Sequence, residues 1–203
     1  MTKKLFFSEQ ISTLLLQLEQ QDQKERDQGV DISLRLRQIP RETGEYLYIF
    51  LKTFIKSKDF IGLEIGTSGG YSTIWQGLAI KSIGYGFLLS IDNDPKKFRQ
   101  AKQNITDCDL NNHVRLINAD AKEFIPNNIK SLDYVFLDAE KEDYSNYFDI
   151  LHDILKPSAV LIADNVISHK EDMLEFITKL ETSQTIDYTI LNIGKGLAFV
   201  RKI

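Results

Sequence analysis

Seven short apolar runs, separated by longer amphipathic stretches, follow one another from Phe60 to the end of the chain. This alternation predicts strands and helices in turn, which build a mostly parallel sheet covered by helices. The predicted strands are 60–65, 86–91, 114–117, 134–137, 160–163, 188–190 and 197–200. The predicted helices between them are 72–83, 95–105, 121–126, 144–155 and 170–182. We therefore expect an α/β fold with a doubly wound, seven-stranded sheet.

The two ends of this pattern differ from its middle. The last two runs flank Gly194 and Gly196 with no helix between them, so we expect an antiparallel hairpin. Before the sheet, apolar residues recur at three- and four-residue spacing over 5–26 and again between Pro40 and Lys58, which predicts two extra helices. No repeat, low-complexity tract or linker interrupts the chain. The predicted organisation is a single domain over 1–203, with N-terminal helices in 1–58 and an α/β core in 59–203.

Composition limits the classes of protein to which the chain can belong. Hydrophobic residues make up 42% of the sequence, enough for a core that needs no disulfide or metal to fold. The net charge of −4 excludes the broad cationic bias of proteins that coat nucleic acid, but it leaves a local basic patch open. The single cysteine, Cys108, excludes an internal disulfide and a thiol-based metal site.

The sequence carries no pattern of a targeting or membrane segment. Ser8, Glu9 and Gln10 interrupt the N-terminal apolar residues before these could form a signal peptide. Nowhere do 18 apolar residues run together, as a bilayer-spanning helix requires. We therefore expect a cytoplasmic protein with no membrane partner.

A glycine-rich turn follows the first predicted strand. The segment from Leu63 to Ser72 reads Leu-Glu-Ile-Gly-Thr-Ser-Gly-Gly-Tyr-Ser, so backbone amides and a helix N-terminus can approach a polar or anionic ligand. The order E-x-G-x-x-x-G is neither the G-x-G-x-x-G of dinucleotide enzymes nor a phosphate loop. From the turn alone, binding of S-adenosylmethionine and an ordinary strand-to-helix connection both stay open.

Acidic residues follow the second and third predicted strands. Asp92 lies 28 positions after Glu64, where a carboxylate can accept hydrogen bonds from ribose hydroxyls. Asp94 precedes Pro95 and is expected to cap the next helix. Asp120 follows the third strand, where it would either meet an adenine amino group or cap a helix. These positions favour a nucleoside ligand.

Hard oxygen ligands follow the fourth and fifth predicted strands. Asp138 ends one strand, and Asp164 with Asn165 ends the other, so neighbouring parallel strands would bring all three together. Two carboxylates and an amide suit a divalent cation such as Mg²⁺ that keeps positions open for water or substrate. Lys141 would lie beside this cation, where a lysine loses its proton more readily and can act as a general base. The alternative is that each residue only caps a loop or helix.

Five segments together carry a more specific signal than any one motif. They are Leu-Glu-Ile-Gly-Thr with Gly-Tyr-Ser within 63–72, Ile-Asp-Asn-Asp-Pro at 91–95, Asp-Ala-Glu-Lys-Glu-Asp-Tyr at 138–144, Ala-Asp-Asn-Val at 163–166 and Gly-Lys-Gly-Leu at 194–197. From about Ile39 to the C-terminus, the chain resembles the cation-dependent, S-adenosylmethionine-dependent O-methyltransferases, which include catechol and caffeoyl-coenzyme A O-methyltransferases. The resemblance implies a Rossmann-like fold and methyl transfer to a hydroxyl.

The resemblance also implies a role for each candidate residue. The implied cofactor-binding residues are Glu64, Gly66, Thr67, Ser72, Asp92, Asp120, Ala121 and Asp138. The implied metal ligands are Asp138, Asp164 and Asn165, and the implied catalytic residues are Asp138 and Lys141, with Lys141 as the base. Catechol enzymes carry a histidine where this chain has Ala139, which leaves the acceptor open. In this family the N-terminal region helps to cover the acceptor pocket and to build a homodimer.

Several acceptors and functions remain open on the sequence. A small catechol-like or other vicinal-oxygen molecule is the first candidate acceptor, and a hydroxylated uridine in tRNA, which some bacterial relatives modify, is the second. Arg35, Arg37 and Arg41 would form either a phosphate-contacting cluster or a solvated face. A non-catalytic nucleoside-binding module is a further alternative, whereas the glycine order disfavours a dinucleotide-dependent dehydrogenase.

Overall fold

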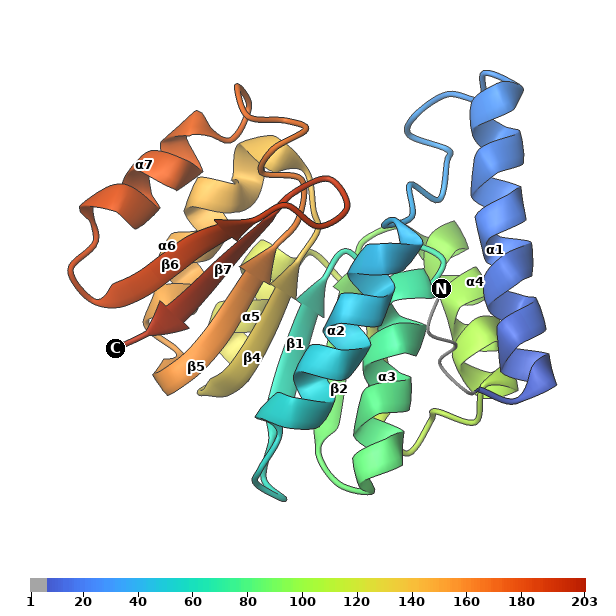
Figure 1. The fold of residues 1–203 in the computed structure, drawn as a ribbon, viewed down its shortest axis with the longest axis horizontal. Coiled ribbons are helices and arrows are strands. Elements are labelled where there is room, and N and C mark those ends of the chain that lie inside the picture. The colour runs from blue at the N-terminus through green and yellow to red at the C-terminus, as the bar shows by residue number, and fades with distance from the viewer. Residues whose placement is uncertain (1–6) are drawn as a thin grey trace.

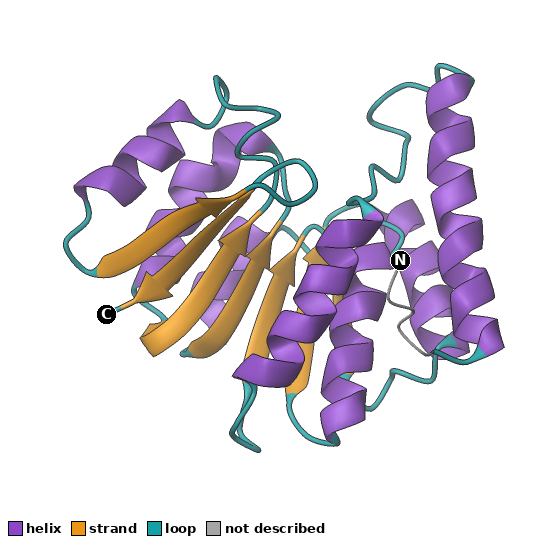
Figure 2. Ribbon diagram, viewed as in Figure 1, coloured by secondary structure: helices purple, strands orange, loops and turns teal. Residues whose placement is uncertain are grey.

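The chain builds one mixed sheet with helices on both of its faces (Figures 1 and 2), in a computed structural model that describes residues 7–203. The strands are β1 Ile61–Ile65, β2 Phe87–Asp92, β3 Val114–Asn118, β4 Leu132–Leu137, β5 Leu155–Ala163, β6 Ile186–Leu191 and β7 Leu197–Lys202. Their order across the sheet is β3-β2-β1-β4-β5-β7-β6. β1 to β5 run parallel, and β7 is antiparallel to both of its neighbours. The predicted α/β fold with its C-terminal hairpin is confirmed.

Helices enclose a separate apolar core on each face of the sheet. They are α1 Glu9–Asp27, α2 Arg41–Phe54, α3 Tyr71–Ile83, α4 Pro95–Asp107, α5 Ala121–Asn128, α6 Tyr144–His152 and α7 Leu174–Thr182, with a 3-10 turn, η1, at Lys141–Asp143. One core lies between the sheet and α1 to α4 and includes the fully buried Trp75. The other lies between the sheet and α5 to α7 and includes Phe176. Among the described residues, no helix has the length and apolar character needed to cross a bilayer.

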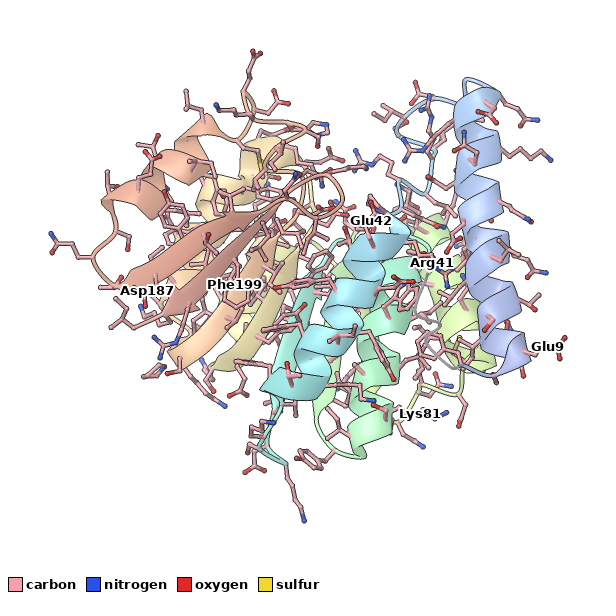
Figure 3. The ribbon with its side chains drawn as sticks, viewed as in Figure 1. Glu9, Arg41, Glu42, Lys81, Asp187 and Phe199 are labelled. Carbon is pink, nitrogen blue, oxygen red and sulfur yellow. The ribbon has the colours of Figure 1, made fainter. Side chains whose placement is uncertain are left out.

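The first helix is anchored to α2 and α3 by one carboxylate. It begins at Glu9, later than the predicted start at residue 5, because Ser8 caps the helix and accepts a hydrogen bond from Ile11 N at 3.3 Å. Residues 5 and 6 of the predicted helix lie outside the described range. Glu19 accepts from Tyr71 Oη at 2.6 Å and from Arg41 Nη1 at 2.9 Å. Figure 3 shows Arg41 between α1 and α2. This anchoring places the C-terminal half of α1 next to the loops at the carboxyl edge of the sheet.

Two further helices differ from the prediction at one end. The helix expected to reach Lys58 ends at Phe54, because Ile55 turns extended and is buried. The helix expected over 170–182 begins at Leu174. The preceding residues form turns instead, and these turns belong to the loop that follows β5.

For Leu155 the sequence pattern predicts a helix, but the structure has a strand. Leu155 was expected to end the helix over 144–155, but that helix ends at His152 and Leu155 begins β5. Leu155 pairs with Leu132 of β4 and packs in the core formed with α5 to α7. Strand pairing and burial override a local helical pattern here, because both depend on residues distant in the sequence.

Candidate active site

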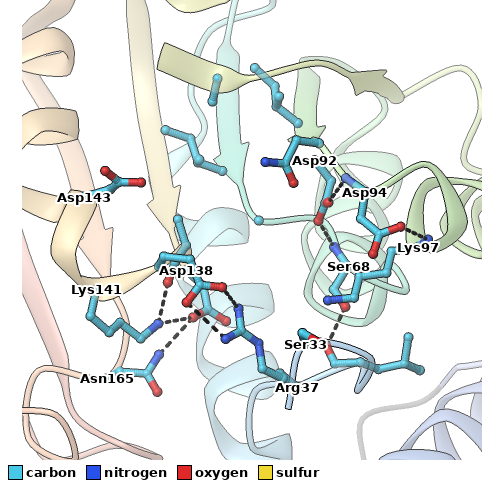
Figure 4. A pocket seen from close by; sticks show the side chains of 18 of the residues that line it. Ser33, Arg37, Ser68, Asp92, Asp94, Lys97, Asp138, Lys141, Asp143 and Asn165 are labelled. Carbon is cyan, nitrogen blue, oxygen red and sulfur yellow. Dashed lines mark hydrogen bonds and ion pairs between the residues drawn. The ribbon is translucent and has the colours of Figure 1, made fainter. Parts of the chain in front are cut away.

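The carboxyl ends of the parallel strands surround a cavity of about 410 Å³. Its wall combines the loops after β1 to β5 with segment 28–40 and the turn between β6 and β7. In Figure 4, Asp92 and Ser68 lie at one side of the cavity, and Asp138, Lys141 and Asn165 lie at the other. We call these the Asp92 side and the Asp138 side. Ligand sites of doubly wound sheets lie at this edge, where parallel strands end together.

The glycine-rich turn after β1 runs directly against the loop after β4. Gly66 has a φ of +102°, and a β-carbon there would overlap the Asp138 carbonyl oxygen and lie 2.8 Å from the carbonyl carbon. The Gly66 amide donates to Ile91 O at 2.9 Å, and Gly70, with a φ of +84°, begins α3. Glycine alone tolerates both this backbone conformation and this approach. The turn therefore joins the ends of β1, β2 and β4 at the floor of the cavity.

The Glu64 carboxylate lies beneath this turn and is fully buried. Its donors are Ser72 Oγ at 2.6 Å, Gln76 Nε2 at 2.7 Å, Ser90 Oγ at 2.5 Å and the Thr73 hydroxyl. Of the four predicted cofactor-binding residues in and beside this turn, Gly66 lies on the cavity wall. Glu64, Thr67 and Ser72 are buried, and the Glu64–Ser72 hydrogen bond ties β1 to the start of α3.

Glu64 is expected to make stability depend on pH. Burial raises the pKa of Glu64 from 4.5 to about 7, against the opposing effect of its donors. The folded state therefore binds the extra proton, so this contribution to stability is complete below the unfolded pKa and is lost as pH rises through about 7. We expect the free energy of unfolding to fall by up to about 1.4 kcal/mol per pH unit in that window.

Urea unfolding at pH values from 4 to 8 measures this dependence. A Glu64→Gln variant should lose the part of the slope that Glu64 supplies, because its side chain does not titrate. Glu42→Gln is the matched control, since Glu42 is exposed at the start of α2 and should leave the slope unchanged. An identical slope in wild type and Glu64→Gln would contradict the prediction.

The Asp92 side presents two carboxylates with different partners. Asp92 accepts hydrogen bonds from Ser68 N at 2.7 Å and from Asp94 N at 2.8 Å, and it lines the cavity. Asp120 caps α5 through a backbone amide at 2.8 Å and lines the cavity beside Ala121. Asp120 can therefore cap α5 and still face a ligand in the cavity, so the two roles predicted for it do not exclude each other. Asp94 caps α4, as predicted.

The structure brings together the three predicted metal ligands on the Asp138 side. Asp138 follows β4 and Asp164 follows the adjacent parallel strand β5. Asn165 Nδ2 donates to Asp138 Oδ1 at 2.9 Å. Asp164 is fully buried, and neither of its carboxylate oxygens has a hydrogen-bond partner within residues 7–203. Burial, together with the nearby charge of Asp138, raises the pKa of Asp164.

An unpartnered buried carboxylate is costly unless a cation or donor meets it. Within the described range, no three His, Cys, Asp or Glu side chains gather as a metal site, so the donor set is two carboxylates with the amide of Asn165. Hard oxygen donors of this kind suit Mg²⁺, which keeps part of its water shell. The residues present therefore fit a divalent cation.

Lys141, the predicted base, lies beside Asp138 on the cavity wall. Its Nζ lies 3.0 Å from Asp138 Oδ1 and 2.7 Å from the Ala139 carbonyl oxygen. Tyr144, which is fully buried, donates its hydroxyl proton to Leu137 O at 3.1 Å and supports the lysine from below, with 3.3 Å between Lys141 Nζ and Tyr144 Oη. Lys141 is thus held at the cavity wall beside the candidate cation site.

Comparison with known proteins decides the family. The family described as "Methyltransferase domain" matches residues 63–166. The catechol O-methyltransferase of Niastella koreensis is 34% identical over 162 residues, which cover 68% of this chain and 72% of that one. The chain belongs to the methyltransferase domain family. It is an S-adenosylmethionine-dependent O-methyltransferase, related to the catechol and caffeoyl-coenzyme A enzymes.

Other relatives extend the similarity over the whole chain. The caffeoyl-CoA O-methyltransferase of Stellaria longipes is 26% identical over 237 aligned positions, covering 98% of this chain and 96% of that one. The crystal structure of the O-methyltransferase from Bacillus cereus with SAH superposes with a TM-score of 0.77 at 21% identity, covering 94% of this chain and 91% of that one. The structural likeness shows that the two chains share a fold over most of their length.

Segment 28–40 of this O-methyltransferase lines the cavity, in keeping with the pocket-covering role that the family resemblance implies for the N-terminal region, through contacts that the sequence did not predict. Leu36 N donates to Glu25 Oε2 of α1 at 2.9 Å. Ser68 Oγ of the glycine-rich turn donates to Leu36 O at 2.5 Å. The segment is thus held between α1 and the turn, and its residues line the cavity.

Arg35, Arg37 and Arg41 do not form one cluster in the structure. Arg41 pairs with Glu19 and Glu45, whereas Arg35 and Arg37 line the cavity. Arg37 extends into the cavity (Figure 4), and its Nη1 lies 3.2 Å from a carboxylate oxygen of Glu140, which follows β4. The two residues lie 103 positions apart, so no local pattern could have paired them.

The Arg37–Glu140 ion pair is expected to slow release of the cofactor. It joins segment 28–40 to the loop beside Asp138 across the cavity, but both side chains are partly exposed, so the pair contributes at most about 1 kcal/mol. We expect Arg37→Ala to raise the Kd of S-adenosylmethionine up to about fivefold, mainly through faster dissociation. Stopped-flow binding at low and high salt measures this. Glu140→Gln should raise the Kd by the same factor, and the double variant should raise it no further, because both changes remove one ion pair. Additive effects on the Kd would contradict the pairing.

Proposed function

We propose that this protein is a divalent-cation-dependent O-methyltransferase whose acceptor is a small molecule with two adjacent oxygens, such as a catechol. The observation that carries the proposal is the fully buried Asp164, whose two oxygens lack partners beside Asp138 and Asn165. A cation at this position would bind the acceptor oxygens as its remaining ligands. The names of the catechol and caffeoyl-CoA relatives support an acceptor of this kind.

The side chains of the cavity would divide the work of such a reaction. Asp138, Asp164 and Asn165 would hold the cation, and Lys141 Nζ would take the proton from the acceptor hydroxyl. When bound, the cation would lower the pKa of that hydroxyl and S-adenosylmethionine would supply the methyl group. Asp92, Asp120 and Ala121 would orient the cofactor from the opposite side, and Gly66 would contact it from the floor of the cavity. Orientation and electrostatics supply most of the rate enhancement in a site of this kind.

Methylation of a hydroxylated uridine in tRNA is the alternative. It needs a phosphate-contacting surface, and the separation of Arg41 from Arg35 and Arg37 weakens the cluster on which that alternative depended. The binding experiment below includes tRNA, and its salt dependence would report phosphate contacts directly.

Calorimetric titration of the metal-stripped protein tests the proposal. S-adenosylmethionine is added first, then catechol with and without Mg²⁺. We expect the cofactor to bind and catechol to bind only with Mg²⁺, followed by methyl transfer in the same mixture. Cofactor binding without catechol binding, combined with salt-sensitive tRNA binding, would favour the tRNA alternative. Binding of the cofactor with no transfer to either acceptor would favour a non-catalytic nucleoside-binding module.

Three broader predictions belong to the same proposal. They are a single domain over 1–203, a homodimer and a cytoplasmic location. Sedimentation equilibrium tests the homodimer. A mass near 23.4 kDa is that of the monomer and would contradict the prediction of a homodimer.

A further inference from the structure

Most cationic side chains on the cavity wall already have a carboxylate partner. Arg37 pairs with Glu140, Lys141 with Asp138, and Lys122 with Asp143. Within residues 7–203, Lys97 and Lys195 have no hydrogen bond or ion pair from the ammonium group, yet both line the cavity and are half-buried. Lys97 lies on the Asp92 side, beside Asp94, which leaves Lys195 as the candidate for the other side (Figure 4). A partly desolvated cation of this kind attracts an anion more strongly than a surface lysine does.

The backbone around Lys195 is held in place by neighbouring elements. The β6–β7 turn carries two glycines in the left-handed region, Gly194 and Gly196, and a β-carbon at either would overlap Thr43 or Ile167. Lys195 O accepts hydrogen bonds from two backbone amides of the loop after β5, at 3.2 and 3.0 Å. The turn is therefore wedged between the start of α2 and the loop that carries Asn165.

Lys195 belongs to the Asp138 side of the cavity. It shares the wall there with Asn165 and His169, on the loop to which its own turn is bonded. The Asp92 side, where the cofactor would lie, is formed by other strands. Lys195 thus stands next to the place that the acceptor would occupy.

We infer that Lys195 binds a carboxylate on the methyl acceptor, so that the preferred acceptors are small aromatic vicinal diols bearing an acid group. This inference rests on the proposed function. A single ammonium matches one negative charge, whereas phosphate sites usually combine several donors or a helix N-terminus. The cavity volume of about 410 Å³, which the cofactor shares, favours a small acid over a polymer.

Steady-state kinetics with a matched pair of acceptors tests the inference. The probes are catechol, which is neutral, and 3,4-dihydroxybenzoate, which adds a carboxylate to the same diol. The readout is the ratio of kcat/KM for the acid to kcat/KM for catechol. In wild type we expect the ratio to favour the acid, and in Lys195→Gln we expect it to fall about tenfold through a higher KM for the acid. Lys195→Arg should keep most of the preference, because it keeps the charge.

Lys170→Gln is the control variant. Lys170 is exposed on the same loop as Asn165 but does not line the cavity, so removing its charge should leave the ratio unchanged. An unchanged ratio in Lys195→Gln, with catechol still methylated, would overturn the inference and leave the proposed function standing. Failure of wild type to methylate either diol in the presence of Mg²⁺ would overturn both.

Discussion

Replacing Asp164 with alanine is expected to lower metal-dependent methyl transfer about a thousandfold, equivalent to about 4 kcal/mol of activation free energy. Asp164 is fully buried with two unpartnered oxygens, so it has no evident role in holding the apo fold together. Its loss removes one of the two carboxylates available to the cation. Turnover measured across a Mg²⁺ titration, with direct calorimetry of Mg²⁺ binding, reports both effects.

The same substitution makes an opposite prediction for stability. A buried carboxylate without a partner costs free energy in the metal-free protein, so Asp164→Ala should raise the free energy of unfolding by about 1–2 kcal/mol when chelator is present. Added Mg²⁺ should stabilise wild type by mass action but not the variant. Loss of activity with gained stability is a pattern that simple misfolding cannot produce.

Asp172→Ala is the control for both measurements. Asp172 is exposed on the loop after β5 and does not line the cavity, so its removal should change neither Mg²⁺ binding nor stability. Full activity of Asp164→Ala in the presence of chelator would remove Asp164 from the cation site. Lower stability of the metal-free variant would show that Asp164 has a structural role instead.

The arrangement of Asp138, Asp164 and Asn165 was predictable because it follows from strand order alone. Each residue directly follows a buried apolar run, and neighbouring parallel strands end at the same edge of a sheet. The same rule brought Asp92 and Asp120 to the cavity wall. Predictions of this kind need only the pattern of each strand and the connection between strands.

Strand order does not predict contacts that depend on the direction in which a single side chain points. Glu64 lies within β1 rather than after it, and its side chain lies under the turn with four donors of its own. Arg37 meets Glu140 only because segment 28–40 is held over the cavity by α1. Leu155 pairs with Leu132, a partner that no helical periodicity within 144–155 could reveal. Each case is decided by packing between segments distant in sequence.

Replacing Gly66 with alanine is expected to disrupt both sides of the cavity at once. The added β-carbon would overlap the carbonyl oxygen of Asp138, so the glycine-rich turn and the loop after β4 would have to separate. The strained φ adds to this cost, and we expect a loss of about 3 kcal/mol or more in the free energy of unfolding. The affinities for S-adenosylmethionine and for Mg²⁺ should fall together, because Gly66 and Asp138 move apart. Urea unfolding and calorimetry of each ligand measure these effects.

Gly84→Ala separates the two causes of that loss. Gly84 ends α3 with a φ of +87°, close to the +102° of Gly66, but a β-carbon there would have no atom within 4 Å. Its substitution therefore carries the backbone strain alone, about 1 kcal/mol, and should leave both ligand affinities unchanged. If Gly66→Ala costs no more stability than Gly84→Ala and keeps both affinities, the contact between the turn and Asp138 does not couple the two sides. If Gly66→Ala loses one affinity and keeps the other, the cofactor and the cation are held independently.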